Sequence, residues 1–332
     1  MKLFVTGGAG FIGSNFIRYM MKKYPKYQII NYDKLTYAGN LDNLRDIEKN
    51  PKYKFVKGDI CDFKKVSKCI KGVDAIINFA AETHVDRSIL NADQFIQTSV
   101  NGTFALLEAA KFHKIKRFVQ VSTDEVYGSI LKGSFTENSP ISPNSPYSSA
   151  KASADLLVKS YFTTYGFPAV ITRCSNNYGP YQYPEKVIPL FVTNALDDLE
   201  VPLYGDGKNV RDWLYVLDHC KGIDIAFHKG KDGEVYNIGG GVELTNIELT
   251  KKVLQIVGKP QSLIKKVKDR PGHDRRYSID CSKISKLGYK ADYTFEKALK
   301  ETVEWYINNQ KIWRKLKDKD YKKYYEKQYK KS

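Results

Sequence analysis

The chain has 332 residues, 42% of them hydrophobic and 27% charged, which is typical of a soluble globular protein with one large or two fused domains. No apolar run approaches the roughly 18 residues of a membrane helix, and the N-terminal MKLFVTGG lacks a signal-peptide layout. The five cysteines show no CxxC spacing. We therefore expect reduced thiols, no metal site, no membrane association and a cytoplasmic location.

The net charge of +17 raises the question of a polyanionic partner, but much of the excess is local. Residues 311–332 carry ten Lys or Arg and three Asp or Glu, which leaves +10 over the preceding 310 residues. We expect this segment to be a basic Lys/Tyr-rich tail that is solvated, frayed or helical, and we expect no nucleic-acid partner. General basicity also suits an enzyme that handles phosphorylated substrates.

The first half of the chain alternates between two patterns. Short apolar runs bounded by Gly or Asp predict strands over residues 2–7, 28–33, 53–59, 74–80 and 116–123. Helical patterns separate them over residues 11–23, 62–72 and 92–113. This alternation predicts an α/β protein with a Rossmann-type, doubly wound parallel sheet.

The next helix covers residues 145–166, with Ser145 as its N-cap and Pro146 in its first turn, and a strand and loop follow over 167–179. After about residue 180 the segments are shorter and Pro and Gly are denser. We predict a dinucleotide-binding domain over 1–178 that receives strands from the second half. A smaller α+β lobe over 179–310 and the tail over 311–332 follow.

A glycine-rich loop joins the first strand to the first helix. Gly7, Gly10 and Gly13 allow a tight turn and a close approach to a pyrophosphate at the helix N-terminus. The second strand ends in Asp33, and an acid there suits the hydroxyls of an adenosine ribose and disfavours a 2′-phosphate. The cofactor is therefore predicted to be NAD. Asp59 in GDI would lie along the adenine, although a strand-end cap explains it nearly as well.

Two further motifs carry polar chemistry. Tyr147 and Lys151 lie four residues apart and so share one helix face, where a nearby ammonium and a positive nicotinamide ring would lower the pKa of the phenol. YxxxK also occurs by chance, and its place after the strand that leads into STDEVYG is what favours a function. In that stretch Asp124 and Glu125 stand side by side at a strand end, which is costly unless they are used, although a polar strand terminus is the plain alternative.

The glycine loop, the strand-end Ser-Thr and YxxxK resemble the extended short-chain dehydrogenase/reductase superfamily. Within it, AAETHVDRSI (80–89), STDEVYG, SPYSSAKASAD, RCSNNYGPYQYPEKVIPL, GDGKNVRDWLYVLDH, YNIGG and RPGHDRRY resemble the nucleotide-sugar 4,6-dehydratases. The resemblance extends to about residue 310. It implies oxidation at C4 of the sugar, loss of water across C5–C6 and return of the hydride to C6. It also implies dTDP-glucose as substrate and a homodimer joined through a four-helix bundle.

The resemblance assigns roles to five residues: Tyr147 as base at the 4-hydroxyl, Lys151 as its partner on the nicotinamide ribose, and Thr123 on the 4-oxygen. Glu125 is implied as the base at C5 and Asp124 as the acid at C6. Repulsion between two partly buried acids should keep one of them protonated.

The remaining implied contacts fall into two groups. The cofactor contacts are Gly7, Gly10, Phe11, Ile12, Gly13, Asp33, Lys34, Thr36, Asp59, Ile60, Ala80, Ala81, Thr98, Tyr147, Lys151 and Asn177. The substrate contacts are Thr83, His84, Asn176, Lys186, Val187, Ile188, Pro189, Pro202, Tyr204, Arg211, Asn246, Arg270 and His273.

Two alternatives stay open at this point. An NAD-dependent nucleotide-sugar 4-epimerase or decarboxylase would use the same scaffold. A non-catalytic NAD-binding regulator would use the basic tail to reach nucleic acid, but that class typically lacks the Tyr–Lys pair present here.

Overall fold

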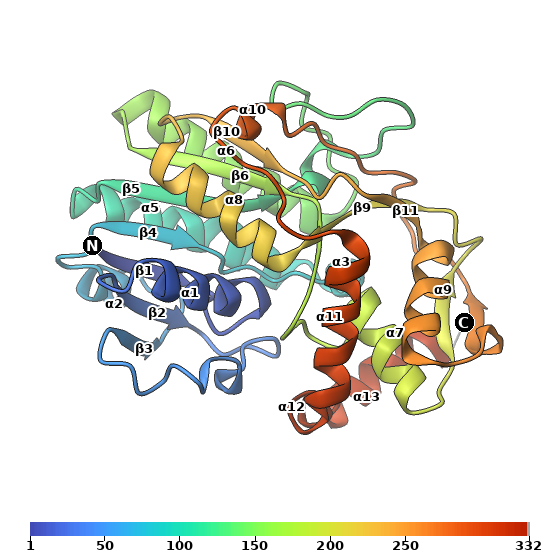
Figure 1. Cartoon of the computed structure of the whole chain (residues 1–332). Helices are drawn as coiled ribbons and strands as arrows, with labels where there is room; N and C mark the ends of the chain where they lie inside the picture. The colour runs from blue at the N-terminus through green and yellow to red at the C-terminus, as the bar shows by residue number, and fades with distance from the viewer. Residues whose placement is uncertain (331–332) are drawn as a thin grey trace.

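Short runs of buried residues form seven parallel strands, and they make the main sheet of the computed structural model, which describes residues 1–330 (Figure 1). Their order across the sheet is β10-β6-β5-β4-β1-β2-β3, so the winding direction reverses between β1 and β4. This confirms the predicted Rossmann-type α/β fold. The strands are β1 (Lys2–Thr6), β2 (Gln28–Asp33), β3 (Tyr53–Lys57), β4 (Ala75–Asn78), β5 (Arg117–Thr123), β6 (Ala169–Cys174) and β10 (Val235–Ile238).

Helices cover both faces of this sheet, as parallel βαβ connections require. In Figure 1, α1 and α8 lie in front of the strands, and α2 and α5 lie behind them. The helices around the sheet are α1 (Phe11–Lys23), α2 (Phe63–Cys69), α3 (Val85–Leu90), α4 (Asp93–Ile96), α5 (Thr103–Phe112), α6 (Pro146–Tyr165) and α8 (Val216–Lys229). Single helical turns cover Leu41–Leu44 and Asp124–Tyr127.

The predicted helix over 92–113 is continuous but irregular. A π-helical stretch, Gln97–Gly102, separates α4 from α5. The short helix α3 was not predicted, because it lies inside the polar AAETHVDRSI stretch and carries too few apolar residues to show a helical period. The predicted N-terminus of α6 is confirmed: the Ser145 hydroxyl caps the helix in a capping box with Ser148, and Pro146 occupies the first turn.

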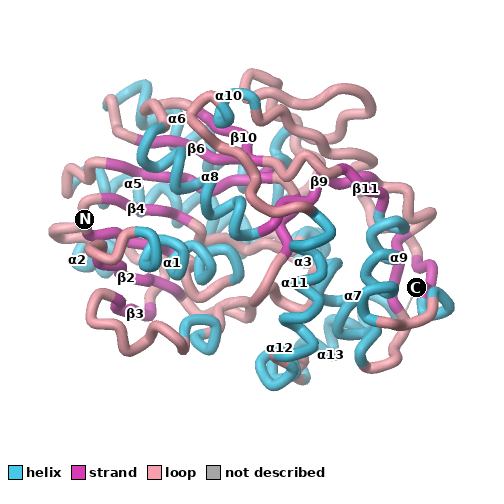
Figure 2. The backbone as a smooth tube through the Cα atoms, in the orientation of Figure 1, coloured by secondary structure: helices cyan, strands magenta, loops and turns pink. Residues whose placement is uncertain are grey.

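The smaller lobe lies beyond the carboxyl ends of the strands. Its two small sheets are β11-β9-β7 and β12-β8. Its elements are β7 (Asn176–Tyr178), α7 (Val187–Leu196), β8 (Val201–Tyr204), β9 (Val210–Tyr215), β11 (Glu243–Thr245), α9 (Asn246–Val257), a turn Gln261–Leu263, β12 (Ile264–Val267) and α11 (Phe295–Asn308). The short helix α10 (Ser282–Ser285) packs instead against β10 and α8 at the main sheet. Figure 2 shows that long loops connect them, more than around the main sheet.

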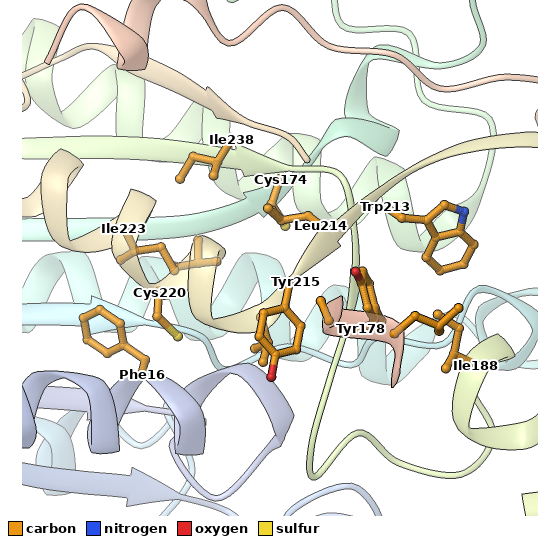
Figure 3. Packing of buried hydrophobic residues seen from close by; sticks show 14 of the residues in the cluster. Phe16, Cys174, Tyr178, Ile188, Trp213, Leu214, Tyr215, Cys220, Ile223 and Ile238 are labelled. Atoms are coloured by element: carbon orange, nitrogen blue, oxygen red, sulfur yellow. The ribbon is translucent and has the colours of Figure 1, made fainter. Parts of the chain in front are cut away.

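One hydrophobic core runs through both parts of the molecule. Figure 3 shows Phe16 of α1 and Ile238 of β10 in the same packed cluster as Trp213 of β9 and Ile188 of α7. The chain also returns to the main sheet after β9, because α8 packs on α1 and β10 pairs with β6. The second lobe is therefore held on the sheet by continuous packing.

The C-terminal residues fold onto the body of the protein. They form α12 (Gln310–Leu316), α13 (Lys319–Tyr325) and a π-helical turn, Glu326–Lys330. Trp313, Tyr321 and Tyr324 are buried, so the expectation of a solvated tail is wrong for its aromatic side chains, while most of its lysines face outward. Nowhere in residues 1–330 does a helix combine the length and apolarity needed to cross a membrane.

Candidate active site

The glycine loop lies where the sheet reverses direction, between the carboxyl ends of β1 and β4. Gly7 has a φ of +66°, and a Cβ on Gly13 would lie 2.4 Å from the Gly7 carbonyl oxygen, so both positions require glycine. Gly10 is the N-cap of α1 and supplies no side-chain cap. The first N–H groups of α1 are therefore left to the pocket, as a bound diphosphate requires.

Asp33 ends β2 beside this loop and is almost fully buried. One carboxylate oxygen accepts a hydrogen bond from the Ala9 amide at 2.9 Å and the other accepts from the Leu35 amide at 2.8 Å. Burial raises the pKa of Asp33, and these two backbone hydrogen bonds oppose the rise. Asp33 thus fixes the turn, and each oxygen keeps a lone pair for a ribose hydroxyl.

A single cleft collects every residue predicted to contact the cofactor. It extends from the glycine loop past the ion pair of Lys34 and Asp59, 2.7 Å apart, to the end of β5 and the start of α6. An open helix N-terminus, a strand-end acid and a cleft with apolar walls fit a dinucleotide. Thr83, Asn176 and Lys186 of the predicted substrate contacts line the same cleft.

The acidic pair follows β5 on a single helical turn. The Thr123 hydroxyl accepts a hydrogen bond from the Glu125 amide at 3.2 Å and donates to Asp124 Oδ1 at 3.3 Å. Thr123 therefore acts as the cap of this turn and holds both acids at the strand end. Thr123, Asp124, Glu125, Tyr147 and Lys151 all line the cleft.

The two acids differ in their electrostatic surroundings. Burial raises the pKa of Asp124 well above its usual value, and the charges of Glu125 and Asp212 raise it further. Burial also raises the pKa of Glu125, but Arg270, Lys186 and Arg211 oppose the rise. The surroundings therefore favour a protonated Asp124 beside an ionised Glu125.

Helix α6 presents Tyr147 and Lys151 to the cleft and is tied to β6 by a buried ion pair, with Arg173 Nε 2.9 Å from Asp155 Oδ2. Lys151 Nζ donates to the Val121 carbonyl at 2.7 Å. Burial raises the pKa of Tyr147 well above its usual value, and Glu125 raises it further. The pKa of Tyr147 is thus raised in the chain alone, chiefly by burial, and the expected lowering stays a prediction that depends on the nicotinamide ring.

The other predicted substrate contacts lie outside the cleft. Ile188 is buried in the hydrophobic core, so its side chain does not face a ligand site. Arg211 donates to the Val210 and Asp274 carbonyls, and His273 Nδ1 lies 2.6 Å from Asp269 Oδ1. Of the remaining residues, His84 is the N-cap of α3 and Arg270 follows β12. The others lie in α7 (Val187, Pro189), in β8 (Pro202, Tyr204) and at the start of α9 (Asn246).

Several cleft residues were not predicted. Glu82, Gln182 and Tyr183 line the cleft, and burial raises the pKa of Glu82. A buried acid just after a strand was a usable signal for Glu82, as it was for the pair after β5. Gln182 and Tyr183 lie in a loop without a local pattern. Within residues 1–330, no three His, Cys, Asp or Glu side chains group as a metal site.

Relatives of this chain share its length and its fold. The dTDP-glucose 4,6-dehydratase of Streptomyces niveus is 52% identical over 325 residues, which cover 96% of this chain and 97% of that protein. The crystal structure of the dTDP-glucose 4,6-dehydratase of Streptomyces venezuelae, with NAD bound, is 53% identical, with a TM-score of 0.94 over 95% of this chain and all of that one.

More distant structures share the scaffold. The UDP-glucose 4-epimerase of Thermotoga maritima, crystallised with UDP-glucose, is 30% identical, with a TM-score of 0.87 over 93% of this chain and all of that one. The GDP-mannose 4,6 dehydratase family model matches residues 4–302, which include the glycine loop, the acidic pair and YxxxK. The chain therefore belongs to the GDP-mannose 4,6 dehydratase family.

Proposed function

We propose that this protein is an NAD-dependent hydro-lyase that converts dTDP-glucose to dTDP-4-keto-6-deoxyglucose. The chain belongs to this family and is 52% identical to a dehydratase over nearly its whole length, so it is an enzyme. The observation that carries the specific reaction is the pair Asp124–Glu125 in the same cleft as Tyr147 and Lys151. A 4-epimerase needs only a hydride transfer, whereas loss of water needs a base and an acid at two neighbouring carbons.

NAD⁺, when bound in the cleft, would supply the acceptor for the C4 hydride and its donor to C6, and its cationic ring would favour the phenolate of Tyr147. The chain's own part is to hold it through the glycine loop and Asp33. The apolar walls of the cleft also exclude water from the reacting carbons.

The residues at the end of β5 and the start of α6 carry out the proton transfers. Tyr147 takes the proton of the 4-hydroxyl, Lys151 holds the ribose beside it, and Thr123 donates a hydrogen bond to the 4-oxygen. Glu125 then removes the proton at C5, which the 4-keto group acidifies, and Asp124 gives its proton to the departing 6-hydroxyl. When the hydride returns to C6, Glu125 gives its proton back to C5, which completes the 4-keto-6-deoxy product. Burial raises the pKa of both acids, but neighbouring acids add to the rise at Asp124 while cations oppose it at Glu125, and this difference supports the division.

The cations of the second lobe bind the diphosphate of the substrate. Arg270, Lys186 and Arg211 all act on Glu125 through their charge, so they lie close enough to the sugar site to bind a nucleoside diphosphate. On this basis we assign the nucleotide-sugar contacts to residues 179–310. Within that range, β10 and α8 belong to the dinucleotide-binding domain. All five cysteines are free thiols, which fits the cytoplasmic location proposed for the enzyme.

The first test is the reaction itself. Purified protein given dTDP-glucose should yield a 4-keto-6-deoxy sugar nucleotide, detected by mass as the loss of one water. UDP-glucose serves as the comparison substrate. Formation of a UDP-galactose product with no loss of water would overturn the proposal in favour of a 4-epimerase.

Replacing the proposed C5 base separates the chemical steps. Glu125→Gln should slow loss of water by about 100-fold or more, because a neutral amide cannot take the C5 proton. Oxidation at C4 should continue, so the absorbance of the reduced cofactor should appear and persist after dTDP-glucose is added. Equal loss of both steps would contradict the assignment of Glu125.

Replacing the proposed C4 base should have the opposite signature. Tyr147→Phe removes the hydroxyl that takes the 4-hydroxyl proton, so reduced cofactor should form about 100-fold more slowly or not at all. Stopped-flow absorbance on a single turnover measures this directly. Reduced cofactor formed at the wild-type rate would mean that another group is the base.

We also propose a homodimer through α5 and α6. These neighbouring helices expose Phe104, Leu156 and Phe162, an apolar patch on their outer face. Leu156→Glu should shift the protein from dimer to monomer in sedimentation velocity, because it would bury a charge in the interface. Leu131→Glu is the matched control, since Leu131 is 76% exposed on a loop. A monomeric wild type would contradict the proposal.

A further inference from the structure

The C-terminal strap, which we define as residues 318–330, reaches a polar network beside the second-lobe cations. Arg270 Nη1 lies 3.0 Å from Asp86 Oδ1, and Tyr204 donates from its hydroxyl to Asp86 Oδ2 at 2.8 Å. Gln328 of the strap donates from Nε2 to the Tyr204 hydroxyl at 2.7 Å and to Asp86 Oδ2 at 3.4 Å. The strap therefore contacts the carboxylate that holds Arg270.

Arg270 is placed to act on a ligand. Among the charges that oppose the rise in the pKa of Glu125, that of Arg270 is the largest, so the guanidinium lies within electrostatic reach of the acidic pair. Its Nε atom is buried and makes no hydrogen bond within the described residues. A buried, unpaired guanidinium donor is costly unless an acceptor is supplied, and the oxygens of a diphosphate are such acceptors.

Asp86 must stay oriented for this arrangement to work. It is 4% exposed, and its two oxygens divide between Arg270 on one side and the Tyr204–Gln328 pair on the other. If the strap amide is lost, Tyr204 loses a donor and Asp86 loses one of its two fixed contacts at Oδ2. The carboxylate is then free to turn, and Arg270 turns with it.

The strap is itself firmly seated. The Tyr321 hydroxyl donates to the Pro184 carbonyl at 3.2 Å. Arg87, next to Asp86 on α3, lies between two aromatic rings, 4.4 Å from the centre of Tyr324 in the strap and 4.1 Å from the centre of Tyr37 beside the cofactor cleft. The strap thus connects α3, the loop before α7 and the substrate lobe.

We propose that Gln328 of the C-terminal strap is a positioning residue, which holds Arg270 through Asp86 and Tyr204 for binding the diphosphate of the nucleotide sugar. The inference rests on the proposed function, because that function supplies the nucleotide ligand. It gives the segment that looked like a solvated basic tail a part in substrate affinity. This role of the strap does not involve nucleic-acid binding.

The test is a pair of substitutions at Gln328, read by calorimetric binding of dTDP to the NAD-loaded full-length enzyme. Gln328→Ala should weaken dTDP binding by about tenfold, the size of one hydrogen bond to a charged group. Gln328→Glu keeps the shape but places a carboxylate against Asp86, so the loss should be greater still. Binding of NAD should stay within twofold of wild type in both variants.

A matched control lies one helix earlier. Lys323 is in the same strap, but its side chain is 81% exposed and lies 4.0 Å from the carboxylate of Asp320. Lys323→Ala should leave dTDP binding unchanged. With dTDP-glucose, Gln328→Ala should raise KM with kcat nearly unchanged, because binding is affected and the proton-transfer groups are not.

Each result bears on the inference. Wild-type dTDP affinity in Gln328→Ala, with the fold intact by circular dichroism, would overturn it, and so would equal loss of dTDP and NAD binding. Protein that binds dTDP and depends on Gln328, yet does not dehydrate dTDP-glucose, would uphold the strap and reject the proposed reaction. Wild-type protein that binds neither dTDP nor UDP would overturn both.

Discussion

The partly buried carboxylate of Glu125 at the end of β5 is the constraint on which the site depends. Glu125 loses hydration there, and this loss is tolerable only beside positive charge. None of that charge comes from the main sheet: Lys186 precedes α7, Arg211 lies in β9 and Arg270 follows β12. The second lobe must therefore pack against the carboxyl edge of the sheet, and the core that runs through both parts keeps it there.

The same constraint separates two neighbouring acids. Burial and the charges of Glu125 and Asp212 raise the pKa of Asp124, whereas cations oppose the rise at Glu125, so the surroundings favour the proton on Asp124. One backbone turn, capped by Thr123, thus carries an acid and a base. Hydride transfer alone needs neither, which is why this turn, more than the glycine loop or YxxxK, favours dehydration over epimerisation.

Local patterns predicted what depends on neighbours in sequence. The glycine loop, the acid at the end of β2 and the capped YxxxK helix all form as expected, because a turn, a strand end and a helix start are local events. The pKa of Tyr147 could not be predicted, since Glu125 and burial set it through space. A helical C-terminal segment was among the expectations, but the burial of Trp313, Tyr321 and Tyr324 was not predicted, because the lysines around them dominate the local pattern.

The remaining features of the site depend on contacts between residues that are far apart in the sequence. Asp86 and Arg87 are adjacent on α3 with opposite charges, and each pairs with a residue far along the chain: Arg270 for the first and Glu185, at 2.9 Å, for the second. Both also contact the strap, near Gln328 and Tyr324. Because Arg87 packs on Tyr37 beside the cofactor cleft and Asp86 holds Arg270 beside the sugar site, α3 joins the two halves of the cleft. The strap contacts both charged side chains of this short helix, and Asp86, which is buried, depends on these partners to offset its lost hydration.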